Sequence, residues 1–543
     1  MKQPKREIVL GMNIQHDSGC CLLINGNVAC AISEERLTRV KGAAGGWNAV
    51  KYCLESANIS LQDVRLAVLS SYGEPLSPGF DAGLSRLGFC GKSLEVDHHL
   101  SHACSVFYSS PFEEALIVVV DGAGNSGATE SYYLGSGCQI TRIGGNRRRE
   151  THRGIGKTYE AFTSFLGWTM MESGKTMALA AFGDPERFKS VQLFDIEDDQ
   201  ANGRLKQKYV EGVKQFEREQ SLNFGEPFAK DSTQTSRDVA FLIQDRTERA
   251  LLEIVRYLIR RTGLRKLCLA GGVALNCVAN RRLLDEAGVE QMFIVPAASD
   301  KGQCLGNAFY GHYSQGKGDR CSFPQRDSWG RRYSNAEIKA VLDLRPELGN
   351  NFIVRAPAIE YEYRHDIAQM TAKLLSEGNI VGWFQGESEL GPRALGNRSI
   401  LCSPTDTNLV SRLNAQVKHR EAFRPYAPSI LEEFASDYFD LACPSPFMLF
   451  VARVKPNKRS VICGVVHKDG SARVQTVSRT QNEAFYCLIQ EFYGLTDVPV
   501  VLNTSFNLAG EPIVESPQDA LSVFLRSNMD FLAIGNYLVR RKG

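Results

Sequence analysis

Long apolar runs are missing from this chain of 543 residues. Its longest apolar blocks, such as residues 115–120, have about six residues, whereas a membrane-spanning helix needs roughly 20. Residues 1–7 are polar and charged, and the apolar run after them is too short for the core of a signal peptide. We therefore expect a cytoplasmic protein without a membrane partner.

Paired cysteine motifs are missing as well. The chain has 15 cysteines, scattered from Cys20 to Cys487, but no C-x-x-C pair. An odd number of dispersed cysteines argues against a disulfide framework and against a zinc ribbon. We expect reduced and mostly buried thiols.

An excess of charge of either sign is also absent. Lys and Arg number 63 against 61 Asp and Glu, which gives a formal net charge of +2. With 43% hydrophobic and 23% charged residues, the composition is that of an average soluble globular protein. It argues against disorder, collagen and a nonspecific coat on nucleic acid, so no nucleic-acid partner is expected.

The opening of the chain has the pattern of a strand meander. Three short apolar segments, separated by turns, lie at residues 8–14, 20–24 and 28–32. The first turn contains His16, Asp17 and Ser18. A polar turn in this position can present side chains and amides to a phosphate.

Two later strands each run into glycines. Residues 115–120 end at Asp121-Gly122, and residues 266–270 end at Gly271-Gly272 after a helical pattern over 239–261. Two such turns in one chain predict a duplicated α/β fold. No short-period repeat is visible, which argues against a solenoid.

The composition changes between about residues 316 and 357, where Gly, Asp, Arg, Ser and Pro accumulate. We place the domain boundary there, giving domains 1–345 and 346–543. The second domain contains strands at 380–384 and 498–502 and a final helix that begins at Ser516-Pro517. The fold class is therefore mixed α/β.

Four residues of the first domain have the chemistry of metal ligands. His98 and His102 are four residues apart, which places both imidazoles on one face of a helix. Asp121 and Asp300 can add two carboxylates, and such a set suits ferrous iron, manganese or zinc without a choice among them. A polar helix start with solvated histidines is the alternative.

Arginines and polar residues gather in the second domain. The glycine-bounded segment 391–399 contains Arg393 and Arg398, and Lys418, Arg420 and Arg424 follow. Guanidinium groups bind phosphate and carboxylate oxygens bidentately, so this pattern fits a substrate with several negative charges; the alternative is a solvated basic surface. Two polar clusters, 467–476 and 502–507, are equally typical of a ligand site and of turns.

Together these stretches resemble the O-carbamoyltransferase family of NodU, CmcH and TobZ, which includes Nod-factor and antibiotic-tailoring carbamoyltransferases. The matching stretches occur in family order and are residues 16–18, 34–36 with Arg39 and Lys41, 98–103, 174–177, 270–276, 391–399, 423–425, 470–476 and 503–507. Each motif is weak alone, but the ordered set is specific. The chain departs from the family pattern at residues 387–390 and at residues 42–47. Because of the second departure, the resemblance does not identify the acceptor of the carbamoyl group.

The resemblance implies a first domain of the actin/Hsp70-like (ASKHA) fold, related to the tRNA threonylcarbamoyl-transfer protein, and a second domain of the YrdC-like fold. The YrdC-like domain would form carbamoyl adenylate from carbamoyl phosphate and ATP, releasing phosphate and pyrophosphate. The first domain would pass the carbamoyl group to a hydroxyl of a small specialised metabolite and free AMP. The implied cofactors are magnesium with ATP and a divalent metal, with ferrous iron as the expected ion.

The resemblance also implies site residues. The expected metal ligands are His98, His102, Asp121 and Asp300. Nucleotide contacts are expected from Gly122, Gly271, Gly272, Asn276, Arg398 and Asn503, and catalytic roles from His16, Lys41, Arg393, Lys418, Arg424, Arg473 and Ser505. His16 is the expected base for the hydroxyl, because imidazole has a suitable pKa, and Lys41 would stabilise the AMP phosphate or the oxyanion. Their alternatives are a hydrogen-bonded turn histidine and a surface lysine.

Other functions fit the sequence less well. An actin/Hsp70-like ATP-binding scaffold would leave the arginines without a catalytic purpose. Carbamoyl transfer to tRNA is disfavoured by the balanced charge, and transfer to a protein thiol by the missing C-x-x-C pairs and acylphosphatase-like part. The sequence does not identify the acceptor or its hydroxyl, and a homodimer is only the default expectation for the assembly.

Overall fold

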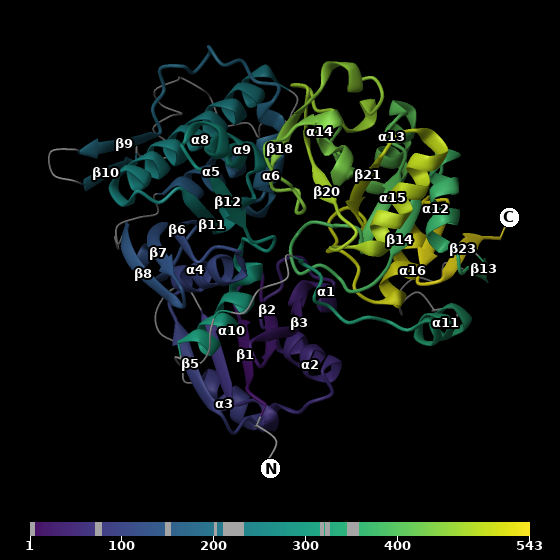
Figure 1. Ribbon diagram of the computed structural model, residues 1–543, viewed down its shortest axis with the longest axis horizontal. Coiled ribbons are helices and arrows are strands. Elements are labelled where there is room, and N and C mark those ends of the chain that lie inside the picture. The colour runs from purple at the N-terminus through teal and green to yellow at the C-terminus, as the bar shows by residue number, and fades with distance from the viewer. Residues whose placement is uncertain are drawn as a thin grey trace. The chain divides into compact units, whose positions relative to one another are not determined.

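The computed structural model describes residues 6–70, 79–146, 154–199, 204–209, 233–314, 320, 326–344 and 358–542. Helices and strands alternate along the chain (Figure 1). Among these residues, no helix combines the length and the apolar character that a membrane span requires. Most of the described cysteines are buried and all of them are free thiols, as expected.

The chain divides into two compact units. The first consists of Met1–Ala31 and Ala44–Pro324, and the second of Ile32–Ala43 and Gln325–Gly543. This division lies earlier in the chain than the predicted boundary at 345/346. It also assigns residues 32–43, which were predicted to belong to the first domain, to the second unit.

The first unit contains two five-stranded sheets. The first sheet has the order β3-β2-β1-β4-β5, in which β1 pairs antiparallel with β2 and parallel with β4, and β4 pairs parallel with β5. The bounds are β1 (Ile8–Asn13), β2 (Gly19–Ile24), β3 (Asn27–Ser33), β4 (Leu66–Ser70) and β5 (Lys92–Val96). The predicted opening meander is therefore confirmed.

The second sheet repeats this topology. Its order is β12-β11-β6-β7-β8, with β6 antiparallel to β7 and parallel to β11, and β11 parallel to β12. The bounds are β6 (Glu114–Val120), β7 (Glu130–Ser136), β8 (Gln139–Gly145), β11 (Lys266–Ala270) and β12 (Gln291–Ile294). Each sheet thus joins three consecutive strands to two parallel ones, which confirms the duplicated α/β fold.

Helices pack on both sheets of the first unit. The helix α10 contacts β1, β2 and β4 of the first sheet, and α4 contacts α10 as well as β6 and β11 of the second. The helices are α2 (Trp47–Ser56), α3 (Gly79–Arg86), α4 (His98–Ser109), α5 (Ile155–Phe165), α6 (Ser173–Ala180), α8 (Gln234–Thr262), α9 (Cys277–Glu286) and α10 (Gln303–Tyr313). A separate pair of strands, β9 (Phe194–Asp199) and β10 (Arg204–Tyr209), contacts α8 through β9.

The second unit is built on an eight-stranded mixed sheet of order β13-β23-β22-β14-β15-β21-β16-β20. Its strands are β13 (Ile359–Tyr363), β14 (Val381–Phe384), β15 (Arg398–Cys402), β16 (Ala427–Leu431), β20 (Gln475–Val477), β21 (Val500–Ser505), β22 (Phe531–Ile534) and β23 (Tyr537–Arg541). A small sheet contains β17 (Phe439–Asp440), β18 (Val451–Val454) and β19 (Ser471–Arg473).

Aromatic side chains fill the core of this unit, where Trp383, Phe485, Phe492, Phe506 and Phe524 are fully buried. The helices are α1 (Glu34–Thr38), α11 (Asn335–Leu344), α12 (Ile367–Ser376), α13 (Thr407–Leu413), α14 (Ala435–Tyr438), α15 (Glu483–Thr496) and α16 (Pro517–Arg526). The last begins as predicted, because Ser516 and Asp519 form a capping box with Pro517 in the first turn.

Candidate functional site

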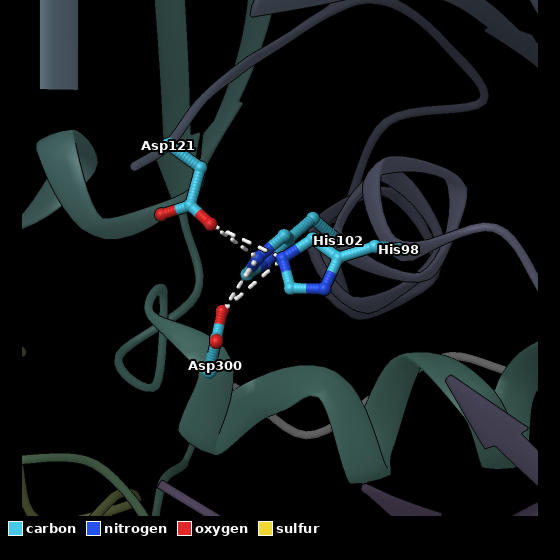
Figure 2. Close-up of side chains that lie close together, drawn as sticks. All are labelled: His98, His102, Asp121 and Asp300. Carbon is cyan, nitrogen blue, oxygen red and sulfur yellow. Dashed lines mark hydrogen bonds and ion pairs between the residues drawn. The ribbon is translucent and has the colours of Figure 1, made fainter. Parts of the chain in front are cut away.

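The first unit brings the four predicted metal ligands together (Figure 2). His98 and His102 stand one turn apart on α4, whose start is capped by the Asp97 side chain. Asp121 follows the buried strand β6, and Asp300 opens a short 3-10 turn after β12. All four residues are buried, and their potential ligand atoms lie within 4.8 Å of one another.

The spacing of these atoms suits a shared cation. His98 Nε2 lies 3.1 Å from Asp121 Oδ2 and 3.3 Å from Asp300 Oδ1, and the corresponding distances from His102 Nε2 are 3.5 and 3.2 Å. Ligand atoms about 2.1 Å from a tetrahedral ion are about 3.4 Å from each other. The arrangement therefore matches the distances between neighbouring ligands in a metal's coordination shell.

Electrostatics within the cluster couple all four groups. Burial alone would lower the pKa of His98, but Asp300 and Asp121 outweigh it and raise this pKa to about 10. The pKa of His102 is raised by the same carboxylates against burial, and the imidazoles lower the pKa of Asp121 and of Asp300. Two imidazolium and two carboxylate groups sum to zero charge. One divalent cation on neutral imidazoles preserves this neutrality, so the donor set fits a divalent metal.

The predicted glycine turn lies beside this cluster. Gly272 N donates to Asp121 Oδ1 at 2.7 Å, so the turn after β11 orients a candidate metal ligand. Gly271 has φ +89°, and a Cβ at this position would meet Val120 O at 2.2 Å, so only glycine fits. A Cβ at Gly122 would meet Glu160 Oε1 at 2.5 Å.

Asn276 is engaged within the protein. Its Oδ1 caps α9 by accepting from Ala279 N, and its Nδ2 donates to Gln244 Oε1 at 2.9 Å. The second bond links the cap of α9 to α8. Nucleotide contacts by Asn276 and by the three glycines stay predictions.

His16 lies next to a candidate metal ligand. Its Nε2 is 3.5 Å from Asp300 Oδ2, and its side chain is half exposed. The turn is held by Asn13, whose Nδ2 donates to the carbonyls of Asp17 and Asp300. Asn13 of the first sheet and Asp300, which follows the second sheet, are thus hydrogen-bonded to each other beside His16.

In the second unit, Lys418 is a buried cation surrounded by oxygens. Its Nζ donates to Ser505 O at 2.8 Å, Asn507 O at 2.9 Å and Asn507 Oδ1 at 2.8 Å, and Ser505 Oγ lies at 3.4 Å. Burial, together with the charges of Arg420, Arg424 and Lys41, lowers the pKa of Lys418 well below its usual range. Lys418 and Ser505, both predicted as catalytic, are therefore in direct contact.

Three arginines share the environment of Lys418. Burial and the charges of Arg424 and Arg473, opposed by Tyr426, together lower the pKa of Arg420 to about 10. Arg420 stacks on Tyr426, with 3.7 Å from Cζ to the ring centroid. We call Lys418, Arg420, Arg424 and Arg473 the cation cluster. Because its members destabilise one another's charge, the cluster is suited to an anionic ligand.

A histidine that sequence reasoning did not single out lies at this cluster. Burial and the charge of Arg473, opposed by Asp469, together lower the pKa of His467 to about 4. The His467 ring contacts Ser471 Oγ at 3.2 Å through Nδ1. The only sequence signal for this residue was its place in the polar stretch 467–476.

Arg398 and Asn503 make structural contacts with the backbone. The Arg398 guanidinium lies 3.7 Å from the Phe384 ring centroid and donates to the carbonyls of Gln385 and Glu515. Asn503 Nδ2 donates to Ala394 O at 3.2 Å. Both residues therefore help to shape residues 391–398, which we call the arginine loop, and their nucleotide contacts stay predictions.

Lys41 and Arg393 complete the predicted set. Lys41 is exposed and belongs to the second unit, where its charge contributes to the low pKa of Lys418. Arg393 is half-buried on the arginine loop. Sequence reasoning missed Glu389 and Gln475, two buried residues that hold this loop through its backbone. Neither residue has a local pattern that would reveal such a contact.

Comparisons with known proteins agree with this arrangement. Residues 87–309 match the family model described as Carbamoyltransferase N-terminus, and residues 372–541 match Carbamoyltransferase C-terminus. The chain is 35% identical to nodulation protein NolNO of Sinorhizobium fredii, over 97% of this chain and 79% of that protein. It is 38% identical to nodulation protein NolO of Bradyrhizobium diazoefficiens, over 82% of this chain and 79% of that protein.

The chain also resembles a solved structure in part. Full-length HypF in its phosphate- and nucleotide-bound form is 14% identical, with a TM-score of 0.36, and the match covers 60% of this chain and 48% of that chain. The two family models and the nodulation proteins confirm the resemblance inferred from the motifs. The chain therefore belongs to the carbamoyltransferase family and is an enzyme that transfers carbamoyl groups.

Proposed function

We propose that this enzyme is an ATP-dependent O-carbamoyltransferase that works in two steps. The second unit forms carbamoyl adenylate from carbamoyl phosphate and ATP. The first unit transfers the carbamoyl group to a hydroxyl of a small specialised metabolite and releases AMP. We extend the proposal to a cytoplasmic enzyme of natural product biosynthesis.

The observation that carries the proposal is the cation cluster of the second unit. Burial and the charges of Arg420 and Arg424 lower the pKa of Lys418, and burial and the charges of Arg424 and Arg473 lower that of Arg420. The cluster therefore gains stability from a ligand that brings negative charge. Carbamoyl phosphate and the ATP phosphates are such ligands, and their condensation places two anions close together. Ser505 Oγ and the Arg473 guanidinium lie in the same environment and supply further donors.

The atom balance of the first step requires one water. Carbamoyl phosphate and water give carbamate and phosphate, and a carbamate oxygen then attacks the α-phosphorus of ATP. The bond from the α-phosphorus to the bridging oxygen breaks, and pyrophosphate leaves. Transfer forms a bond between the acceptor oxygen and the carbamoyl carbon, breaks the bond to AMP and removes the hydroxyl proton.

His16 is the group to which we assign the removal of this proton. It is half exposed, in the turn after β1, and lies 3.5 Å from Asp300. An unperturbed hydroxyl is a poor nucleophile at neutral pH, so a base at this position accelerates transfer. A divalent metal on His98, His102, Asp121 and Asp300, with ferrous iron as the first candidate, would supply positive charge to phosphate oxygens of the nucleotide.

The adenylation step can be tested without knowing the acceptor. The purified protein is incubated with ATP, magnesium and carbamoyl phosphate, and pyrophosphate release and carbamoyl adenylate are followed by coupled assay and mass spectrometry. We expect both products, and neither when carbamoyl phosphate is omitted. Folded, metal-loaded protein that releases no pyrophosphate would contradict the proposal.

Substitutions of two neighbouring histidines, His102 and His99, are expected to differ sharply in their effect on metal binding. His102→Ala and Asp300→Asn are each expected to weaken metal binding at least tenfold, because each removes or neutralises one of four ligands. His99→Ala is the matched control: His99 is on the same helix and buried, but its Nδ1 contacts Ser131 Oγ at 2.7 Å. Metal content after anaerobic loading with ferrous iron, manganese or zinc is the measurement. Equal metal retention by all three variants would show that the cluster is not the site.

A further inference from the structure

The arginine loop is held by hydrogen bonds to its backbone on both sides. Its carbonyl groups accept from side chains of the sheet and of the core: Asn503 Nδ2 donates to Ala394 O, Gln475 Nε2 to Leu395 O, and Trp383 Nε1 to Gly396 O. These contacts occupy the acceptors of three consecutive residues. The donors of the loop therefore need acceptors of their own, because its backbone is buried from residue 394 on.

One side chain supplies most of those acceptors. Glu389 is fully buried, and its Oε1 accepts from Leu395 N at 2.7 Å, Asn397 N at 3.0 Å and Arg398 N at 3.4 Å. A carboxylate that accepts several backbone N–H groups makes charge-assisted bonds, which are stronger than neutral ones. Glu389 thus ties the end of the loop to the segment just before its start.

A second carboxylate fixes the start of the loop. Asp327 Oδ2 accepts from Gly391 N at 2.8 Å, and Asp327 O accepts from Leu390 N at 2.9 Å. From the other side Arg36 Nη2 donates to Gly391 O at 2.7 Å. Hydrogen bonds thus hold the loop at Gly391 and from Ala394 to Arg398, on both sides of Pro392 and Arg393.

We propose that Glu389 is a positioning residue of the carbamoyl-adenylate-forming site, which acts by holding the arginine loop in the shape that presents Arg393 to the substrate. Glu389 itself is buried behind the loop and does not need to touch the substrate. The naming of carbamoyl phosphate as that substrate rests on the proposed function. A displacement of about 1 Å in a positioning group can cost about 100-fold in rate.

Two variants of Glu389 test this role. Glu389→Ala removes the acceptor from three backbone donors, so we expect kcat/KM for carbamoyl phosphate in pyrophosphate release to fall by about 100-fold, mainly through a higher KM. Glu389→Gln keeps one oxygen acceptor, so KM is expected to stay within about tenfold of the wild type, a rescue by the conservative change. Hydrogen exchange of peptides covering residues 391–399 is expected to accelerate in the same order.

Asp530→Ala is the matched control for general loss of stability. Asp530 Oδ2 accepts from Ile380 N at 2.7 Å and from Arg412 Nη2 at 2.6 Å, next to the start of β14 and away from the strand end that leads to the arginine loop. Asp530→Ala and Glu389→Ala are both expected to lower the melting temperature. Only Glu389→Ala should change KM for carbamoyl phosphate and exchange in the loop.

The outcomes separate this role from the proposed function. If the wild type releases pyrophosphate but Glu389→Ala keeps the wild-type KM and loop exchange, the positioning role is wrong and the function stands. If the wild type releases no pyrophosphate, the function falls, and loop exchange still decides whether Glu389 holds the loop. A KM that rises equally in Asp530→Ala would also overturn the positioning role.

Discussion

Arg473→Ala is expected to abolish pyrophosphate release, with kcat/KM for carbamoyl phosphate lowered by about 10³-fold. The Arg473 charge lowers the pKa of both Arg420 and His467, so its guanidinium lies near both of these side chains. Removal of one preorganised donor from a buried site typically costs 10²–10³-fold in rate. The measurement is pyrophosphate release with ATP and carbamoyl phosphate in the absence of an acceptor.

A neighbouring arginine provides the control for this change. Arg453 is exposed on β18 and pairs with Ser471 of β19, the strand that ends at Arg473. Arg453→Ala removes the same side chain from the same small sheet without touching the cation cluster. It is expected to keep the wild-type rate. If Arg473→Ala also kept that rate, adenylate formation would have to occur elsewhere than at the cation cluster.

The metal cluster could be predicted from the sequence because its geometry follows from local rules. A spacing of four residues places His98 and His102 on one face of any helix, and a carboxylate after a buried strand, such as Asp121, faces the edge where ligands bind. The duplicated fold could be predicted for the same reason, since each strand-to-glycine turn is a local pattern. Only the three-dimensional structure shows that the side chains of these residues lie close together.

The support of the arginine loop could not be predicted, because it depends on contacts between distant segments. Gln475 donates to Leu395 O, a partner 80 residues away, and Asn503 donates to Ala394 O, 109 residues away. Arg398 was predicted to contact a nucleotide, yet its guanidinium lies on Phe384 and donates to backbone carbonyls. A sequence pattern can show that an arginine lies in a basic segment. It does not show whether the guanidinium contacts a ligand or the protein itself.

The assignment of residues 32–43 to the second unit also depends on long-range contacts. Arg39 donates to Pro512 O at 2.8 Å and to Ile513 O at 2.6 Å, and Arg36 is fully buried with a bond to Gly391 O. Their sequence pattern is that of a short polar helix, which carries no sign of its partners. The segment follows β3, and the chain rejoins the first unit at Ala44. Lys41 lies in this segment, and its charge lowers the pKa of Lys418.

His16→Ala is expected to separate the two half-reactions. The variant should form carbamoyl adenylate and release pyrophosphate at the wild-type rate, because the cation cluster is unchanged. Carbamoyl transfer should fall by about 10²–10⁴-fold, the usual contribution of a general base. Transfer is measured by mass spectrometry as the gain of one carbamoyl group on a hydroxylated metabolite that the wild type accepts, beside the accumulated adenylate.

His365→Ala is the control for this variant, since His365 is an exposed histidine outside both clusters. Its rates in both steps should equal those of the wild type. Loss of pyrophosphate release in His16→Ala would mean that His16 supports the first step as well. Full transfer by His16→Ala would mean that another group takes the proton. Accumulated adenylate with no transferred product is therefore the result that assigns His16 to the transfer step, because it shows that adenylate formation does not need this side chain.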